Sequence, residues 1–291
     1  MNGHNRLNGK LTLALLVALF GAAAVVAQGT PQQTPATTQA PADKPAAPQA
    51  TPLTLESTPP PVSAEEEAAI KAFRDVKNAD EAKKDQMADD FLQKYPQSRY
   101  RPEIYNWQVK SFYGKGQVDK MEAAGDKELE LLPNSPDPQT LAIVGSTLPR
   151  AMNASTPDPQ KRLTKAEQYC QKSLDILTTM PKPADMTDEV FQRMKDQTSA
   201  FAYSGLGVVA FRRGKYADAI TNLEKSVKLD TQPDPVNYYL LGLSNQRASH
   251  FDDAVAAYTK CAAIPSGMQS TCTQGAEEAK KLAATQLSAP K

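Results

Sequence analysis

The fold of this chain is decided by two stretches, residues 203–229 (YSGLGVVAFRRGKYADAITNLEKSVKL) and residues 238–264 (YYLLGLSNQRASHFDDAVAAYTKCAAI). In both, apolar residues recur about every 3.6 residues instead of alternating, which is the pattern of an amphipathic helix. The two stretches match at a constant offset of 35 residues, as between Gly207 and Gly242 or between Ala219 and Ala254. Small residues at these positions let paired helices lie close together, so the pattern predicts repeated helical units.

Breaks in the pattern divide each unit into two helices. Arg213-Gly214 interrupts the first stretch and Ala248-Ser249-His250 interrupts the second, while Lys115-Gly116 does the same further upstream. Two or three residues are enough for a tight turn between antiparallel helices. The units are therefore helical hairpins.

Helix starts are marked by short polar side chains. Asp137, Asp158 and Asp234 each precede a proline, which suits the first helical position because the missing N–H would be unpaired there. Ser63 with Glu66 predicts a capping box, in which the hydroxyl and the carboxylate each satisfy an amide at the helix end. The helical region is expected to begin at Ser63.

The repeated order of residues is an aromatic, Leu-Gly, a turn, a second aromatic, an alanine and a closing apolar face. It resembles the tetratricopeptide repeat (TPR) family, whose unit is about 34 residues. The clearest repeats are 200–232 and 235–265, and weaker matches extend back to Ser63. The resemblance implies an all-α, right-handed α-solenoid of about five TPR-like helical hairpins over residues 63–287, with a C-terminal capping helix.

The N-terminal segment has the layout of an export signal. Arg6 and Lys10 precede an uncharged apolar run that ends near Ala27. Small residues at Val25 and Ala27 suit signal-peptidase cleavage, and an uncleaved anchor is the alternative because the run is nearly long enough to span a bilayer. Residues 1–27 are thus a signal peptide or membrane anchor. Both place the remainder outside the cytoplasm, in a periplasmic or secreted location or anchored to the inner membrane.

Residues 28–62 are rich in Pro, Ala, Thr and Gln and carry few side chains that a core could bury. Such a composition cannot offset the entropy of ordering, so we expect a disordered linker.

Composition argues against catalysis and nucleic-acid binding. The only histidines are His4, inside the export segment, and His250, in a turn, so no histidine-based catalytic or metal cluster can form. The 33 basic residues are balanced by 33 acidic ones, which leaves no excess positive charge for phosphates. We expect no enzyme activity, no cofactor, no metal and no nucleic acid.

Three cysteines remain. Cys170 falls on the apolar side of its helix and is interpreted as a small buried residue. Cys261 and Cys272 could meet across the turn at Pro265, so a disulfide or two free thiols are both open for an exported protein.

The TPR resemblance also implies a binding surface, because the first helices of successive TPR hairpins line a groove. An apolar and aromatic floor with two arginines suits a peptide or partner helix that carries an acidic group. The Lys and Asn pattern of chaperone-binding TPR domains is missing. The expected function is a protein-interaction scaffold or adaptor in the cell envelope, and the alternative is a structural envelope protein that associates with itself. The implied groove residues are Phe201, Ser204, Val208, Phe211, Arg212, Tyr239, Leu243, Gln246 and Arg247.

Overall fold

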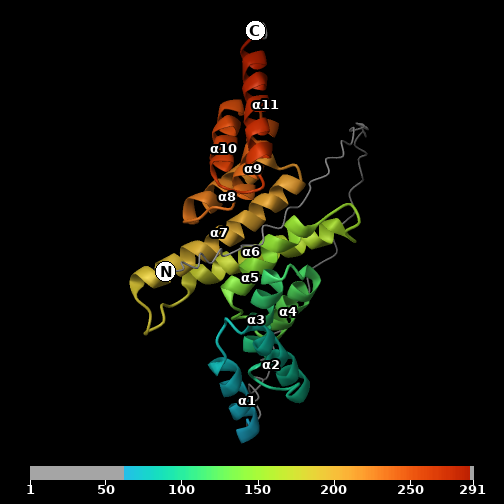
Figure 1. Ribbon diagram of the computed structural model, residues 1–291, viewed down its shortest axis with the longest axis vertical. Helices are drawn as coiled ribbons and strands as arrows, with labels where there is room; N and C mark the ends of the chain where they lie inside the picture. Colours follow the sequence, from blue (N-terminus) through green and yellow to red (C-terminus); the bar gives the residue numbers. More distant parts are fainter. Residues whose placement is uncertain (1–61, 289–291) are drawn as a thin grey trace, which may run out of the picture. The chain divides into compact units, whose positions relative to one another are not determined.

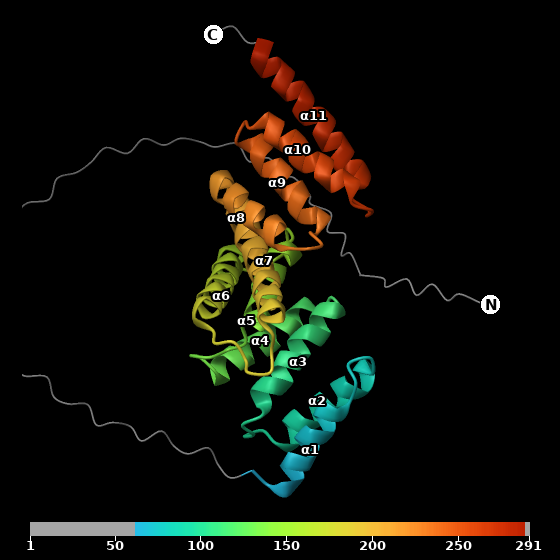
Figure 2. The same cartoon turned by 90° about the vertical axis from the view of Figure 1, so that its left-hand side faces the viewer.

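The computed structural model describes residues 62–288 of the 291-residue chain, and within that range it contains eleven α-helices and no strand. The all-α solenoid is confirmed. Figures 1 and 2 show the helices following one another in chain order from α1 to α11. The predicted export segment, and the predicted linker apart from Val62, lie outside the described residues.

The five hairpins pair α1 with α2, α3 with α4, α5 with α6, α7 with α8 and α9 with α10. We call the odd-numbered member of each pair the first helix and the even-numbered member the second helix.

None of the helices in residues 62–288 combines the length and apolar character that a membrane span requires. The bounds are α1 Ala64–Asp75, α2 Glu81–Lys94, α3 Arg101–Gly114, α4 Val118–Leu131, α5 Pro138–Ala151, α6 Pro159–Thr179, α7 Asp188–Arg212, α8 Tyr216–Leu229, α9 Pro235–Arg247, α10 Phe251–Ala263 and α11 Gln269–Ser288.

Glycine on the first helix allows each of the last three hairpins to close. A Cβ added to Gly207 would lie 2.6 Å from Leu223 Cγ on α8, and one added to Gly242 would lie 2.7 Å from the Tyr258 ring on α10. The equivalent residue of α5 is Gly145, whose added Cβ would lie 2.5 Å from the Cys170 sulfur on α6. A methyl group at any of these positions would force the two helices apart.

The hairpin of α3 and α4 lacks this arrangement. Val109 stands where α5, α7 and α9 have glycine, and the small residue of this hairpin is Gly125 on α4. An added Cβ at Gly125 would lie 2.8 Å from Val144 of α5, but at an ordinary contact distance of 3.8 Å from Val109. The close approach of Gly125 is therefore to the next hairpin and not to its own partner helix.

The ring of Tyr258 on α10 contacts both α9 and the capping helix α11. Tyr258 is 1 % exposed, and Gly275 of α11 approaches its ring as closely as Gly242 does. Cys261 and Cys272 form a disulfide between α10 and α11, with their Cα atoms 5.8 Å apart. The last hairpin and the cap thus share a core residue and a covalent bond.

The helix caps follow the sequence expectation in part. Asp137 and Asp234 accept from backbone amides two residues ahead, at 2.7 and 2.9 Å. Ser63 accepts from Glu66 N at 3.1 Å, but the Glu66 carboxylate accepts from the Ser98 hydroxyl instead, so only half of the predicted capping box forms. Asp158 makes no capping hydrogen bond, because its backbone is left-handed with φ of 43°.

The tight turns within three hairpins need a left-handed residue at the same place. Gly116 and Gly214 have φ of 67° and 73°, and Ser249, which occupies the equivalent position, has φ of 63°. A side chain costs roughly 1–2 kcal/mol in this region of backbone space, whereas glycine does not. Two of the three turns avoid that cost.

We expect Gly214→Ala to lower the free energy of unfolding by about 1 kcal/mol, measured by chemical denaturation. An added Cβ at Gly214 meets no atom within 4 Å, so the loss reports backbone strain alone. Gly114→Ala is the matched control, because its Cβ also meets nothing while its backbone lacks a positive φ. Equal stability of the two variants would contradict the role of the left-handed turn.

Candidate functional site

The first helices of successive hairpins build one surface. Backbone contacts run from α3 to α5, from α5 to α7 and from α7 to α9, whereas no two second helices among the described ones come into backbone contact. α4 and α6 are bridged by long side chains instead, with Lys165 Nζ 2.7 Å from Glu122 and 2.6 Å from Asp126. The crowded surface made by α3, α5, α7 and α9 is called the first-helix face.

A pocket of about 260 Å³ opens where three first helices meet. It lies below the roughly 300–1,000 Å³ of most small-molecule sites, so it suits one large side chain better than a cofactor. We call it the three-helix pocket. It is lined by Lys110 and Tyr113 of α3, Gln139, Ala142 and Ile143 of α5, and Gln197, Thr198 and Phe201 of α7.

The aromatic part of this pocket is accessible. The rings of Tyr113 and Phe201 meet edge to face, with centroids 6.3 Å apart. Tyr113 is 43 % exposed, and burial of its hydroxyl end raises the pKa of the phenol. Val190 is the other exposed large hydrophobic residue among the described ones. An exposed aromatic side chain at the mouth of an apolar pocket is a common anchor for a partner.

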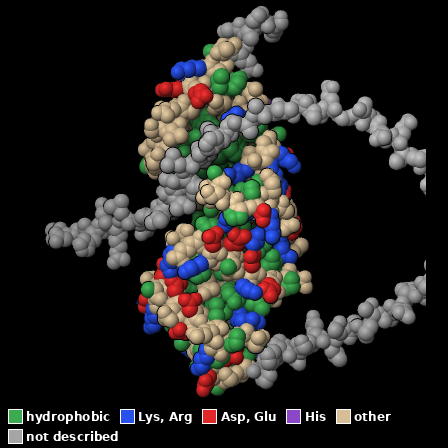
Figure 3. Space-filling model, turned by 90° about the vertical axis from the view of Figure 1, so that its right-hand side faces the viewer, with side chains coloured by type: hydrophobic (Ala, Val, Ile, Leu, Met, Phe, Trp, Pro, Cys, Tyr) green, Lys and Arg blue, Asp and Glu red, His purple; other side chains and the backbone are tan. Residues whose placement is uncertain are grey.

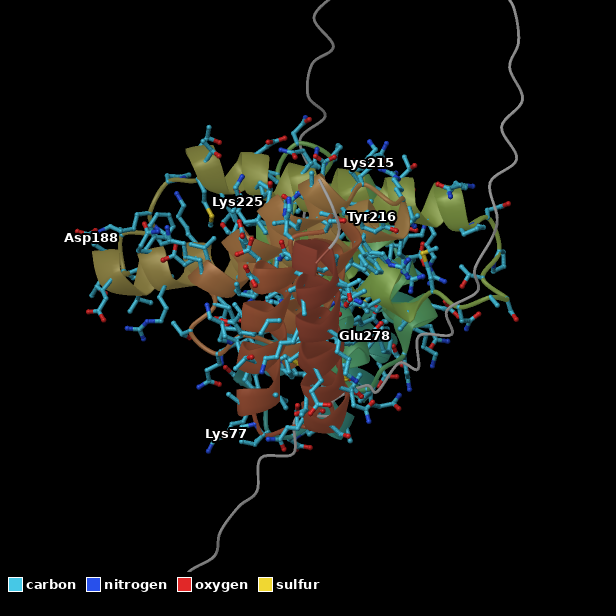
Figure 4. All side chains as sticks on the ribbon, turned by 90° about the horizontal axis from the view of Figure 1, so that it is seen from above. Lys77, Asp188, Lys215, Tyr216, Lys225 and Glu278 are labelled. Atoms are coloured by element: carbon cyan, nitrogen blue, oxygen red, sulfur yellow. A yellow bond between two sulfur atoms is a disulfide. The ribbon has the colours of Figure 1, made fainter. Side chains whose placement is uncertain are left out.

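One wall of the pocket comes from a part of α7 that the repeat does not include. The predicted repeat starts at residue 200, but α7 begins at Asp188 and brings Gln197 and Thr198 to the pocket. Figure 4 shows Asp188 at the free end of α7, far from Tyr216 at the start of α8. The sequence pattern did not reveal this helix start, because the residues before Thr187 are rich in Pro and Met. The Thr187 hydroxyl nevertheless caps the helix by accepting a hydrogen bond from Val190 N.

An arginine missed by the sequence analysis crosses the middle of the first-helix face. Arg150 of α5 donates to Asp234 Oδ2 at 2.6 Å and to the Ser204 hydroxyl at 2.7 Å, and it also hydrogen-bonds Asn237. Ser204 in turn donates to Asn237 Oδ1 at 2.8 Å. This network joins α5, α7 and the start of α9. The sequence feature that could have predicted this network is the position of Arg150, five residues after Gly145.

Two of the predicted groove residues are not available to a partner, which corrects the expectation for them. Ser204 and Val208 are each only 3 % exposed. Ser204 is held by Arg150 and Asn237, and Val208 packs with Leu240 and Leu241 of α9. Both fill the junction between α7 and its neighbours.

The other predicted groove residues divide into two groups. Those of α9 face the cap, because Tyr239 and Leu243 pack against α10 and α11, and Gln246 accepts from the Tyr258 hydroxyl at 3.0 Å. Arg247 is exposed.

The α7 residues fare differently. Phe201 lines the three-helix pocket, Phe211 packs against the Tyr216 ring, and Arg212 donates to the Met152 carbonyl at 3.0 Å. The structure thus brings Phe201 together with α3 and α5 and separates it from the α9 group.

Figure 3 shows acidic and basic side chains interspersed over one face of the molecule. Within residues 62–288, no group of three or more His, Cys, Asp and Glu side chains is arranged to hold a metal ion.

A buried acid lies at the start of α5. Glu128 of α4 is 2 % exposed, and its Oε1 accepts from the Asp137 amide at 2.9 Å at the start of α5. Burial raises the pKa of this carboxyl to about 7, and the hydrogen bond from Asp137 offsets only part of that effect. Asp137 also lies 3.8 Å from Lys110, a pocket residue. Burial thus raises the pKa of Glu128 toward neutral pH at a carboxyl that contacts the start of α5.

Comparisons with known proteins leave the function open. No protein-family model and no curated protein matches the chain. Seventeen chains of solved structures match, and one of them, described as "MamA RS-1 ArsTM double mutant", is 14 % identical with a TM-score of 0.41. That match covers 77 % of this chain and 97 % of the other. The TPR-like description rests on the 35-residue repeat and the hairpin geometry of the chain itself.

The raised pKa of Glu128 predicts a loss of stability as pH rises. Its folded-state pKa of about 7 exceeds the ordinary 4.5, so the folded state favours the protonated acid and loses stability between these values. We expect Glu128→Gln to remove about 2–3 kcal/mol of the decline in unfolding free energy between about pH 5 and pH 8.

Chemical denaturation at the two pH values measures this decline. Glu130→Gln is the matched control, because Glu130 lies on the same helix with a side chain that is 67 % exposed. A parallel pH dependence in wild type and Glu128→Gln would show that Glu128 does not titrate in this range.

Proposed function

We propose that this chain is a non-catalytic scaffold or adaptor of a bacterial cell envelope, whose first-helix face binds a segment of a partner protein. The observation that carries the proposal is the three-helix pocket, where the exposed ring of Tyr113 stands beside Phe201 and the pocket can receive one large side chain. Three hairpins contribute to it, so binding there needs the stacked repeat and not one hairpin alone.

The disulfide supports a location outside the cytoplasm. Disulfides persist in oxidising compartments and are rare where thiols are kept reduced. The bond between Cys261 and Cys272 agrees with the export segment expected over residues 1–27. Residues 28–62 would then separate the helical repeats from the membrane or from the cleavage site.

Site-specific photo-crosslinking tests the binding surface. A photoreactive phenylalanine analogue at position 113 is expected to give covalent adducts with a partner protein in cells, because Tyr113 lies at the mouth of the pocket. The matched control places the same analogue at Val190, which is similarly exposed at 47 % and lies outside the pocket lining.

Equal adduct formation at both positions would argue against the pocket. Adducts made only of two copies of this chain would favour the self-associating alternative. Phe201→Ala is expected to lower adduct formation from position 113, since it removes the ring that packs against Tyr113.

The location is tested by fractionating cells and alkylating free thiols before lysis. We expect Cys261 and Cys272 to be protected from alkylation and the chain to appear in the soluble envelope or membrane fraction. A mature N-terminus at Gln28 indicates a cleaved signal, and an intact Met1 in the membrane fraction indicates an anchor. A cytoplasmic protein with both thiols alkylated would overturn the proposed location.

A further inference from the structure

One buried acid keeps an unsatisfied oxygen at the junction between the second and third hairpins. Glu128 of α4 is 2 % exposed, and its Oε1 accepts from the Asp137 amide at 2.9 Å, directly before α5. Its Oε2 is buried and has no hydrogen-bond partner among the described residues. A carboxylate here would be a buried charge with much of its acceptor capacity unused, whereas a neutral carboxyl is far less costly to bury.

A short chain of polar contacts connects Glu128 to the three-helix pocket. The Asp137 carboxylate accepts from Gln139 N at 2.7 Å and lies 3.8 Å from Lys110 Nζ. Lys110 and Gln139 both line the pocket, one from α3 and one from α5. Asn106 of α3 also donates to the Asp137 carboxylate, at 2.5 Å. The residue that Glu128 contacts is therefore attached to two walls of the pocket.

The charged groups that face Glu128 do not balance a second negative charge. The Asp137 carboxylate is an anion beside it, and the Tyr169 phenol of α6 stays neutral because burial raises its pKa. Lys110 of α3 is the cation that favours the charged acid, and it already lies within ion-pair distance of Asp137. Charging Glu128 would place two carboxylates around this lysine, which favours a separation of α4 from the start of α5.

Other side chains around the pocket titrate far from neutral pH. The histidines of the chain are His4 and His250, and neither lies on α3, α4, α5 or α7. The ordinary pKa values of Asp, Lys and Tyr are well away from 7. A change in the pocket between about pH 6 and pH 8 would therefore point to Glu128, whose carboxyl pKa is raised by burial to about 7.

We propose that Glu128 is a pH sensor for the three-helix pocket: the pocket keeps its binding shape while the acid is neutral, and the start of α5 separates from α4 and releases the partner segment when the acid is charged. The inference rests on the proposed function and adds its regulation. The sign follows from burial, because a neutral carboxyl tolerates removal from water and an anion does not. Binding is thus tighter below neutral pH than above it.

A fluorine reporter tests the link between the acid and the pocket without a partner. 4-Trifluoromethylphenylalanine, whose ring does not titrate, replaces Tyr113 in the full chain, and its 19F resonance is recorded from about pH 5.5 to pH 8.5. The reporter is compared in the otherwise wild-type chain, in Glu128→Gln, which mimics the neutral acid, and in Glu130→Gln. Glu130 is the matched control, because it lies on the same helix with a side chain that is 67 % exposed.

We expect the resonance at position 113 to move with a midpoint near pH 7 in the otherwise wild-type chain and in Glu130→Gln, and to stay constant in Glu128→Gln. Lys110→Met should move the midpoint to higher pH, because this cation favours the charged acid. Circular dichroism at each pH separates a change in the pocket from unfolding. Loss of the helical signal over the same range would show that Glu128 acts on the whole domain and not on the pocket.

Binding is measured by fluorescence anisotropy on the full chain. The probes are labelled, histidine-free peptides selected from a displayed random library at about pH 6. We expect their affinity to fall about tenfold between about pH 6 and pH 8 and to stay constant on Glu128→Gln.

The two proposals fail in different ways. A resonance at position 113 that does not move, or that moves equally in Glu128→Gln, would overturn the sensor and leave the pocket as a binding surface. Peptides that bind with one affinity across the pH range would also overturn the sensor. A resonance that moves with Glu128, together with peptides that bind Phe201→Ala as well as wild type, would overturn the pocket as the binding site and leave its link to the acid.

Discussion

The close approach of two helices at one glycine in each of the last three hairpins is the constraint on which most of this structure depends. In three hairpins the first helix supplies glycine, and the second helix fills the space with Cys170, Leu223 or Tyr258. In the hairpin of α3 and α4 the first helix has Val109 at this position, and Gly125 of the second helix makes its close approach to Val144 of the next hairpin. The last three hairpins are closed at the glycine, and their first helices contact one another in turn, α5 with α7 and α7 with α9.

Much of the fold could be predicted because this constraint is local in sequence. Gly207 and Gly242 stand at one offset, and Gly116 and Gly214 mark the turns, so periodicity and backbone conformation both point to hairpins. The prediction failed where a neighbouring element intervened. Glu66 has a capping position, but Ser98 lies close enough to donate to its carboxylate. Asp158 precedes a proline as the other caps do, and its left-handed backbone turns the side chain away from that role.

The candidate site was harder to predict, because it depends on contacts between repeats. Phe201 was found from its repeat position, but Tyr113 was not, since its own repeat matches the pattern weakly. Ser204 and Val208 have the right register for a groove, yet Arg150 from α5 and leucines from α9 cover them. Which face of a helix is free is set by the neighbours on either side. A single repeat read alone does not contain that information.

The length of α7 has a consequence for stoichiometry. α5 and α9 begin seven residues before their glycines, at Pro138 and Pro235, whereas α7 begins at Asp188, nineteen residues before Gly207. The pocket wall made by Gln197 and Thr198 belongs to these additional turns. A solenoid of this kind can lengthen in evolution by duplicating its hairpin, but copies of the regular unit would not carry the wall with them. The number of anchored partners per chain would therefore stay at one however many hairpins were added.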